Sequence, residues 1–168
     1  MIFLMLLFVI IQPPASKQVV WDWFVLGQLR ATYEHRNAEF EGCLYGIDRP
    51  DSVIFLFFIP SNADPRKATS TTTAAGDCIR LELVSQGYRI YLLARVHSHI
   101  KTESLCLPSS RDQMVFNGNE LPYNVILCDR GRAVFFQDRK NWQKVYALPP
   151  LDSLYKKRFW CYVTKVVR

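Results

Sequence analysis

The sequence predicts a single α/β domain in which a mixed sheet is flanked by helices. The chain has 168 residues, a length typical of one domain with its own core. Apolar residues make up 49% of the chain and charged residues 21%, which is a globular composition. Apolar runs of strand length alternate with segments of helical periodicity, and no internal repeat is visible. These three observations favour a compact mixture of helices and strands.

The elements are expected in the following order. Strands are predicted at residues 42–47, 53–59, 89–99, 123–128, 133–137 and 144–148, and helices at 19–33, 77–86 and 109–116. The first helix follows from a partial helical period, the second is expected to stop at Gly87, and the third to open with a cap at Ser109. The run at 53–59 is apolar throughout, which predicts a strand buried on both faces. Gly131 lies in the turn of a predicted hairpin.

Three parts of the chain are distinguished: an apolar segment at 1–18, the domain at 19–150 and a basic tail at 151–168. The first eleven residues are all apolar, but a helix that spans a bilayer needs about 20. They are interpreted as a strand or tail, with a signal-like or membrane-contacting anchor and a mis-assigned start as alternatives. The expected location is cytoplasmic, and the alternative is an exported or membrane-associated protein.

Charge and cysteine content restrict the classes of partner and compartment. The net charge is +6, but the basic residues are scattered except near the end, so no nucleic-acid partner is expected. A nucleic-acid-binding module built on the final KKRFWCYVTKVVR is the alternative. The five cysteines are widely spaced and form no CxxC pair, which favours buried free thiols in a reducing compartment. They are Cys43, Cys78, Cys106, Cys128 and Cys161.

The segment RVHSHIKTESLCLPSSRD, residues 95–112, contains two of the three histidines of the chain. Alternate residues of a strand share a face, so His97 and His99 are expected to present two imidazoles side by side. Such a pair suits zinc, and Asp112 offers a third ligand. If Ser109 caps a helix, Asp112 lies in its first turn on the same face as Ser109. Two histidines and one carboxylate leave a coordination position open, which is typical of catalytic zinc sites.

These residues resemble the signature of the JAMM metalloproteases, the zinc-bearing MPN or JAB domains. The family pattern is HxH, a spacer of about seven residues and SxxD, preceded upstream by ExxGxLxG. Residues 39–46 read EFEGCLYG and match the upstream motif fully. The resemblance covers residues 19–148 and implies a cytidine-deaminase-like fold. Two departures stand out: Ile100 replaces the usual proline, and the spacer at 100–108 has nine residues.

By this resemblance, His97, His99 and Asp112 would bind Zn²⁺, Glu39 would be the general base, and Ser109 would stabilise the oxyanion. Glu41 is the alternative base. The family implies hydrolysis of a peptide or isopeptide bond in a protein or peptide substrate, at the tail of a ubiquitin-like or other small protein. A non-catalytic MPN-type scaffold is the alternative function.

Several other residues have weaker interpretations. Ser98 is expected either to support the ligands or to be an ordinary packed or solvated serine. Cys106 is interpreted as a loop residue packed against the domain; the alternatives are a fourth zinc ligand and a redox-sensitive thiol. Arg111 and His35 are interpreted as surface residues, with pairing to an acidic substrate the alternative for Arg111. Asn62 resembles an asparagine of the family and is expected to support the fold.

Overall fold

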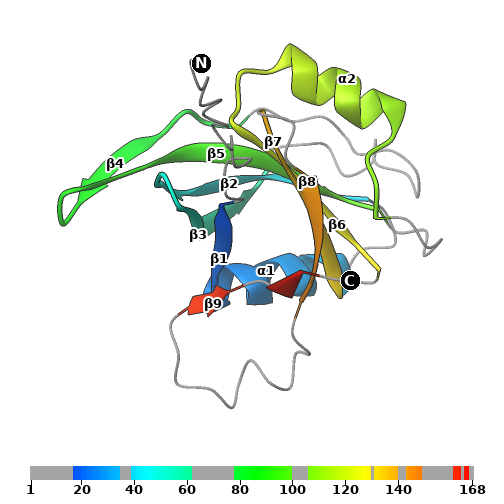
Figure 1. Ribbon diagram of the computed structural model, residues 1–168, viewed down its shortest axis with the longest axis horizontal. Helices are drawn as coiled ribbons and strands as arrows, with labels where there is room; N and C mark the ends of the chain where they lie inside the picture. Colours follow the sequence, from blue (N-terminus) through cyan, green and yellow to red (C-terminus); the bar gives the residue numbers. More distant parts are fainter. Residues whose placement is uncertain are drawn as a thin grey trace, which may run out of the picture.

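The computed structural model describes residues 17–34, 39–61, 78–99, 106–129, 131–139, 143–148, 161–163 and 165–166. In this part of the chain, ten strands form one mixed sheet. The two helices of the described residues, α1 (Trp23–Glu34) and α2 (Ser110–Gly118), lie on opposite sides of the sheet (Figure 1). The predicted class, α/β with a mixed sheet flanked by helices, is confirmed.

The sheet runs in the order β10-β8-β7-β6-β5-β2-β3-β1-β9, and β4 pairs with β5 beside this path. Pairing is parallel between β1 and β3 and between β5 and β6, and antiparallel elsewhere. The strands are β1 (Gln18–Asp22), β2 (Glu41–Asp48), β3 (Ser52–Pro60), β4 (Glu82–Ser85), β5 (Tyr88–Ser98), β6 (Tyr123–Cys128), β7 (Ala133–Asp138), β8 (Gln143–Ala147), β9 (Cys161–Val163) and β10 (Lys165–Val166).

The first helix starts four residues later than predicted, because residues 18–22 form strand β1. Val19 and Trp21 are buried while their neighbours are less so, which is the twofold pattern of a strand. The Asp22 carboxylate then accepts a hydrogen bond from the amide of Phe24 at 2.8 Å and caps the helix that follows. The apolar residues predicted to form one helix are thus divided between strand β1 and helix α1.

The helix predicted at 77–86 is wrong, because this segment contributes strand β4 to a hairpin with β5. Gln86 and Gly87 both have positive φ values, 50° and 80°, as a tight two-residue hairpin turn requires. Gly87 therefore marks a strand turn and not a helix end. The expectation for residues 53–59 is also wrong in part, since Phe57 and Ile59 in the second half of β3 are 46% and 40% exposed.

The main core lies on the α1 side of the sheet, where α1 covers the inward faces of the central strands. Its largest fully buried side chains include Trp21, Phe40, Phe55 and Phe136. Gly42 allows β2 to pack against the ring of Phe58, because a Cβ at this position would overlap that ring. Close packing thus explains a glycine of the upstream motif without reference to catalysis.

Two pairs of cysteines lie together, so the expectation of free thiols is wrong for four of the five. Cys43 of β2 pairs with Cys78, and Cys106 pairs with Cys128 at the end of β6, each with a Cα–Cα distance of 5.6 Å. The separations of 35 and 22 residues give no hint of this, because the sheet topology brings the partners together. Disulfides are typical of proteins that fold in an oxidising compartment.

The segment set apart as a basic tail contributes two short strands. Strand β9 pairs with β1 and strand β10 with β8, at opposite ends of the sheet order. The apolar run at residues 1–11 lies outside the described residues. Within the described part of the chain, neither helix combines the length and apolarity needed to cross a membrane.

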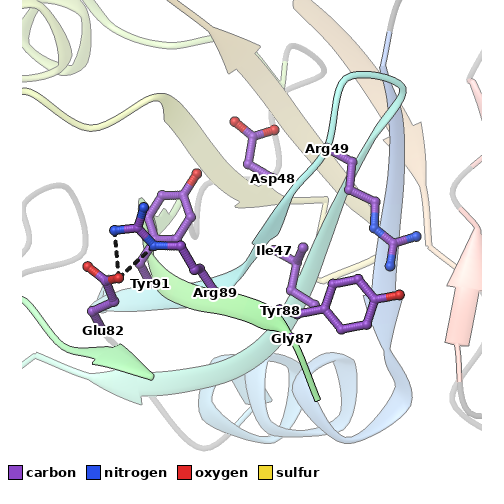
Figure 2. A pocket seen from close by; sticks show the side chains of 8 residues that line it. All are labelled: Ile47, Asp48, Arg49, Glu82, Gly87, Tyr88, Arg89 and Tyr91. Atoms are coloured by element: carbon purple, nitrogen blue, oxygen red, sulfur yellow. Dashed lines mark hydrogen bonds and ion pairs between the residues drawn. The ribbon is translucent and has the colours of Figure 1, made fainter. Parts of the chain in front are cut away.

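A hollow of about 610 Å³ lies between the β2–β3 turn and the β4–β5 turn (Figure 2). Its charged groups are largely engaged with one another: Arg89 pairs with Glu82 at 2.6 Å, and the Arg49 guanidinium lies 4.8 Å from the centre of the Tyr88 ring. Asp48, which also lines the hollow, forms an ion pair with Lys17.

Candidate metal centre

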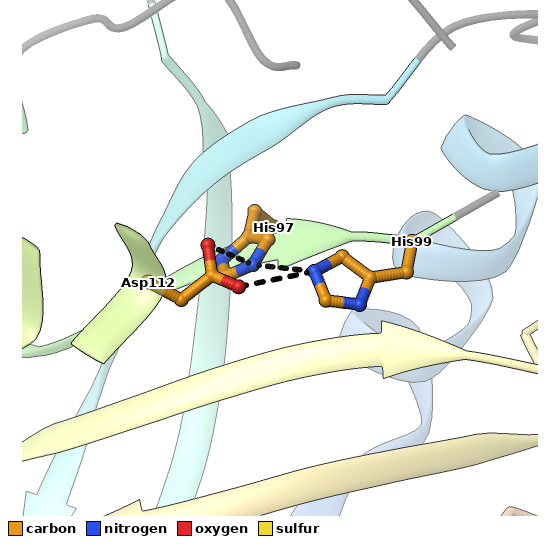
Figure 3. A group of neighbouring side chains, drawn as sticks. All are labelled: His97, His99 and Asp112. Carbon is orange, nitrogen blue, oxygen red and sulfur yellow. Dashed lines mark hydrogen bonds and ion pairs between the residues drawn. The ribbon is translucent and has the colours of Figure 1, made fainter. Parts of the chain in front are cut away.

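The two histidines of the HSH motif lie where strand β5 ends. His97 and His99 project from the same face of the strand toward Asp112, which stands in the first turn of α2 (Figure 3). Their side chains are 14% and 24% exposed, and that of Asp112 is 18% exposed. The three side chains thus form a half-buried cluster on the α2 side of the sheet. It is the only group of this kind with metal-ligand geometry among the residues that the structure describes.

The donor atoms of this cluster converge on one point. The Nε2 atoms of His97 and His99 are 3.2 Å apart. Asp112 places Oδ1 3.1 Å from the first nitrogen and Oδ2 3.3 Å from the second. Ligands at zinc distances of about 2.0–2.1 Å in a tetrahedron are roughly 3.3 Å from one another. The three separations therefore match three edges of a zinc coordination tetrahedron, and the residues present fit this metal.

Asp112 is held in place by the start of helix α2. Ser109 is the helix cap: its hydroxyl accepts a hydrogen bond from the Asp112 amide at 3.2 Å, and its own amide donates to Asp112 Oδ2 at 2.7 Å. This reciprocal capping box fixes the carboxylate relative to the helix axis. Since the Ser109 hydroxyl accepts this bond, its proton is left to donate elsewhere.

The electrostatics of the cluster keep the carboxylate ionised. Burial raises the pKa of Asp112, but hydrogen bonds from His97, His99 and Ser109 outweigh this and hold the pKa far below its ordinary value. The hydrogen bond with Asp112 raises the pKa of His99 above 6.5 against the effect of burial, and the charges of Asp112 and Glu39 add to the rise. The cluster therefore attracts positive charge, as a cation site does.

The predicted base lies beside the histidines. Glu39 is 8% exposed and lies two residues before β2 begins at Glu41, which is the register partner of His97. Phe40 and Ser98 form the next pair, because the Ser98 amide donates to the Phe40 carbonyl at 3.0 Å. Continuing this antiparallel pairing brings Glu39 opposite His99, in agreement with its charge effect on the pKa of that imidazole.

Glu41, the alternative base, is engaged by a different group. Its carboxylate lies 3.4 Å from the guanidinium of Arg95, which stands two residues before His97 on the same face of β5. An ion pair with arginine stabilises the ionised form of a carboxylate and weakens it as a base. Glu41 is thus part of an ion pair on the face of β5 that carries the histidines.

Residues 100–105 of the loop that follows the histidines, together with His35 and Asn62, lie outside the described residues. Cys106 pairs with Cys128 and so does not supply a fourth ligand. Arg111 is exposed in the first turn of α2. Sequence reasoning missed Tyr33, whose hydroxyl donates to the His99 carbonyl at 3.1 Å; a tyrosine near the end of a helix carries no motif that would have revealed it.

No family model and no curated protein matches the chain. Among solved structures, the chain is similar to a JAB1/MPN domain protein from Archaeoglobus fulgidus, with 22% identity over 77% of this chain and 94% of that one, and a TM-score of 0.44.

Proposed function

We propose that this protein is a zinc-dependent metallopeptidase or isopeptidase of the JAMM type. One observation carries the proposal: the nitrogen atoms of His97 and His99 and the carboxylate of Asp112 converge with the spacing of zinc ligands. Three protein ligands leave one position of a tetrahedral zinc open, which is the arrangement of catalytic zinc sites.

In this proposal, each residue of the cluster has a distinct role. When bound, zinc lowers the pKa of a water molecule and polarises a carbonyl group. Glu39 accepts a proton from the attacking water and returns it to the nitrogen of the leaving amine. This carboxylate is 8% exposed, and its charge raises the pKa of His99.

Ser109 contributes a hydrogen-bond donor to the oxyanion of the tetrahedral intermediate. Its hydroxyl accepts from the backbone of the helix turn that it caps, so the oxygen is fixed while its proton stays available. Asp112, three residues on, is positioned by the same capping box. One structural unit, the start of α2, therefore supplies both a metal ligand and a transition-state donor.

We propose that the substrate is a protein or peptide, cut at the tail of a ubiquitin-like or other small protein. An extended tail presents its amide bonds to a site at the end of a sheet without unfolding the rest of its domain. The non-catalytic scaffold is the competing function, since such a chain would use the same fold without hydrolysis.

The deciding experiment measures zinc content and hydrolysis together. We expect one zinc per wild-type chain and hydrolysis of isopeptide-linked di-ubiquitin or of ubiquitin amide-linked to aminocoumarin. A chelator should abolish hydrolysis and added zinc should restore it. Glu39→Gln should keep the zinc and lose hydrolysis. A wild-type chain that carries one zinc yet cuts neither substrate would favour the scaffold, and a chain without zinc would overturn the proposed site.

A further inference from the structure

The hydroxyl of Ser98, between the two histidines, contacts the backbone next to the proposed base. Ser98 is fully buried, and its Oγ accepts a hydrogen bond from the Phe40 amide at 3.0 Å. Phe40 is the residue directly after Glu39. The side chain of the middle residue of HSH therefore points away from the ligands and toward the opposite strand.

This contact replaces a bond of the sheet ladder. In an antiparallel sheet, a hydrogen-bonded pair exchanges two bonds, each from an amide to the opposite carbonyl. The Ser98 amide does donate to the Phe40 carbonyl at 3.0 Å. The return bond from the Phe40 amide goes to the Ser98 hydroxyl rather than to the Ser98 carbonyl. A side chain thus completes the ladder at the point where β2 begins.

This contact matters because Ser98 is the last residue of β5. The next amide along the chain, that of His99, donates to the Leu127 carbonyl of β6 at 2.9 Å, since successive residues of a strand bond neighbours on opposite sides. The His99 carbonyl accepts from the Tyr33 hydroxyl at 3.1 Å. Two hydrogen bonds, one from the Ser98 amide to the Phe40 carbonyl and one from the Phe40 amide to the Ser98 hydroxyl, therefore tie the Glu39–Phe40 segment to the strand carrying the ligands.

We infer that Ser98 is a positioning residue that fixes Glu39 relative to the metal ligands through the Phe40 amide. The inference rests on the proposed function, in which Glu39 moves the proton. Without the hydroxyl, the buried Phe40 amide loses its partner, and the backbone shifts or admits water to satisfy it. Displacing a catalytic group by about 1 Å is enough to lower a rate by roughly a hundredfold.

The test compares Ser98→Ala with Ser98→Thr, which keeps a hydroxyl at the same position. For Ser98→Ala we expect one zinc per chain, an unchanged KM and a kcat for ubiquitin–aminocoumarin that is about tenfold to a hundredfold lower. Hydrogen exchange at the Phe40 amide should become faster by a similar factor. Ser98→Thr should restore the slow exchange and most of kcat.

Ser52→Ala is the matched control, because Ser52 is a buried strand serine whose hydroxyl donates to the carboxylate of its neighbour Asp51 at 3.0 Å. It should leave kcat and the Phe40 exchange unchanged. Unchanged Phe40 exchange in Ser98→Ala would overturn the hydrogen bond, whether or not the threonine variant folds. Faster exchange with an unchanged kcat would overturn the positioning role, and loss of zinc would assign Ser98 to the ligands instead.

Failure of the proposed function gives a different result. A wild-type chain that binds zinc but hydrolyses neither substrate would overturn that function and, with it, the claim that Ser98 serves a reaction. The exchange measurement would still decide whether the hydroxyl holds the Phe40 amide.

Discussion

The two ends of strands β2 and β5 both carry clusters of charged and polar side chains, but the clusters are built differently. At one end, Lys17 pairs with Asp48, and the hydroxyl of Tyr123 donates to the same carboxylate at 2.6 Å. At the other end, two imidazoles and the Asp112 carboxylate point their donor atoms at one another, 3.1–3.3 Å apart. The first cluster contains a lysine that neutralises its carboxylate, whereas the second directs three potential metal ligands toward one point.

This difference separates a structural cluster from a functional one. Asp48 receives a lysine and a phenol, so its charge is compensated within the protein. Asp112 receives groups that are themselves metal ligands, and its negative charge is matched only when an imidazole is protonated or a metal is bound. The neighbouring hollow follows the first pattern, since Arg89 and Glu82 lining it pair with each other.

The largest expected effect comes from removing the carboxylate of the metal-ligand cluster, compared with removing the carboxylate of the other cluster. Asp112→Ala should abolish zinc binding and reduce hydrolysis below detection, because only two protein ligands remain. Asp48→Ala, the matched control, should keep one zinc per chain and the wild-type rate while lowering thermal stability. Metal analysis and the ubiquitin–aminocoumarin assay check both variants. If Asp112→Ala retained its zinc, the histidine–aspartate cluster would not be distinguished from the Lys17–Asp48 cluster as the metal site.

The next effect compares two glutamates at the start of β2. Glu39→Gln should lower kcat by roughly 10²–10⁴-fold with zinc retained, the range that general acid–base catalysis contributes. Glu41→Gln should have a much smaller effect, since its carboxylate is paired with Arg95. Steady-state kinetics with parallel metal analysis decide the matter. A larger loss in Glu41→Gln would exchange the roles of the two residues.

The metal end should also respond to pH. The hydrogen bond with Asp112 raises the pKa of His99 in the metal-free protein above 6.5, so protons compete with zinc at a higher pH than for an ordinary histidine. Below this raised pKa, we expect zinc affinity to fall about tenfold per pH unit for each proton displaced. Competition with a chelator from pH 5.5 to 7.5 measures the slope; an affinity independent of pH would contradict the arrangement.

The same shift predicts the opposite trend for the metal-free fold. A pKa raised on folding stabilises the protein fully below the unfolded value near 6.5, and this contribution disappears as pH rises through the folded value. Thermal unfolding of the chelator-treated protein should show it, and Asp112→Ala should remove it.

The smallest effect is expected at the structural end. Tyr123→Phe removes the hydroxyl that donates to Asp48 and accepts from Lys17 at 3.0 Å. We expect a loss of about 1.5–3 kcal/mol in the free energy of unfolding, which is what one hydrogen bond to a charged group contributes. Zinc content and kcat should not change. Denaturant titration checks the first expectation, and a change in kcat would show that the two ends communicate.

The proximity of His97, His99 and Asp112 was predicted more accurately than the elements around them. His97, His99, Ser109 and Asp112 could be identified because their geometry is local: a two-residue spacing in a strand and a three-residue spacing in a helix turn. The helix at α2 was predicted with its cap for the same reason.

The errors lie where distant segments decide the structure. Residues 77–86 carry spacing compatible with a helix, but pairing with β5 makes them a strand. The cysteine pairs and the Tyr33–His99 contact join residues 22 to 66 positions apart, which no local pattern encodes. The Ser98 hydrogen bond depends on the strand register, which is a property of two segments and not of one.

One consequence follows from the two strands at residues 161–166. They are separated by a single residue, yet β9 is the edge strand at one end of the sheet order and β10 is the edge strand at the other end. One short segment therefore pairs with the backbone amides and carbonyls of both β1 and β8, which as exposed edge strands would promote self-association. Deleting residues 161–168 should expose the edges of β1 and β8 together, and light scattering would detect the resulting aggregation.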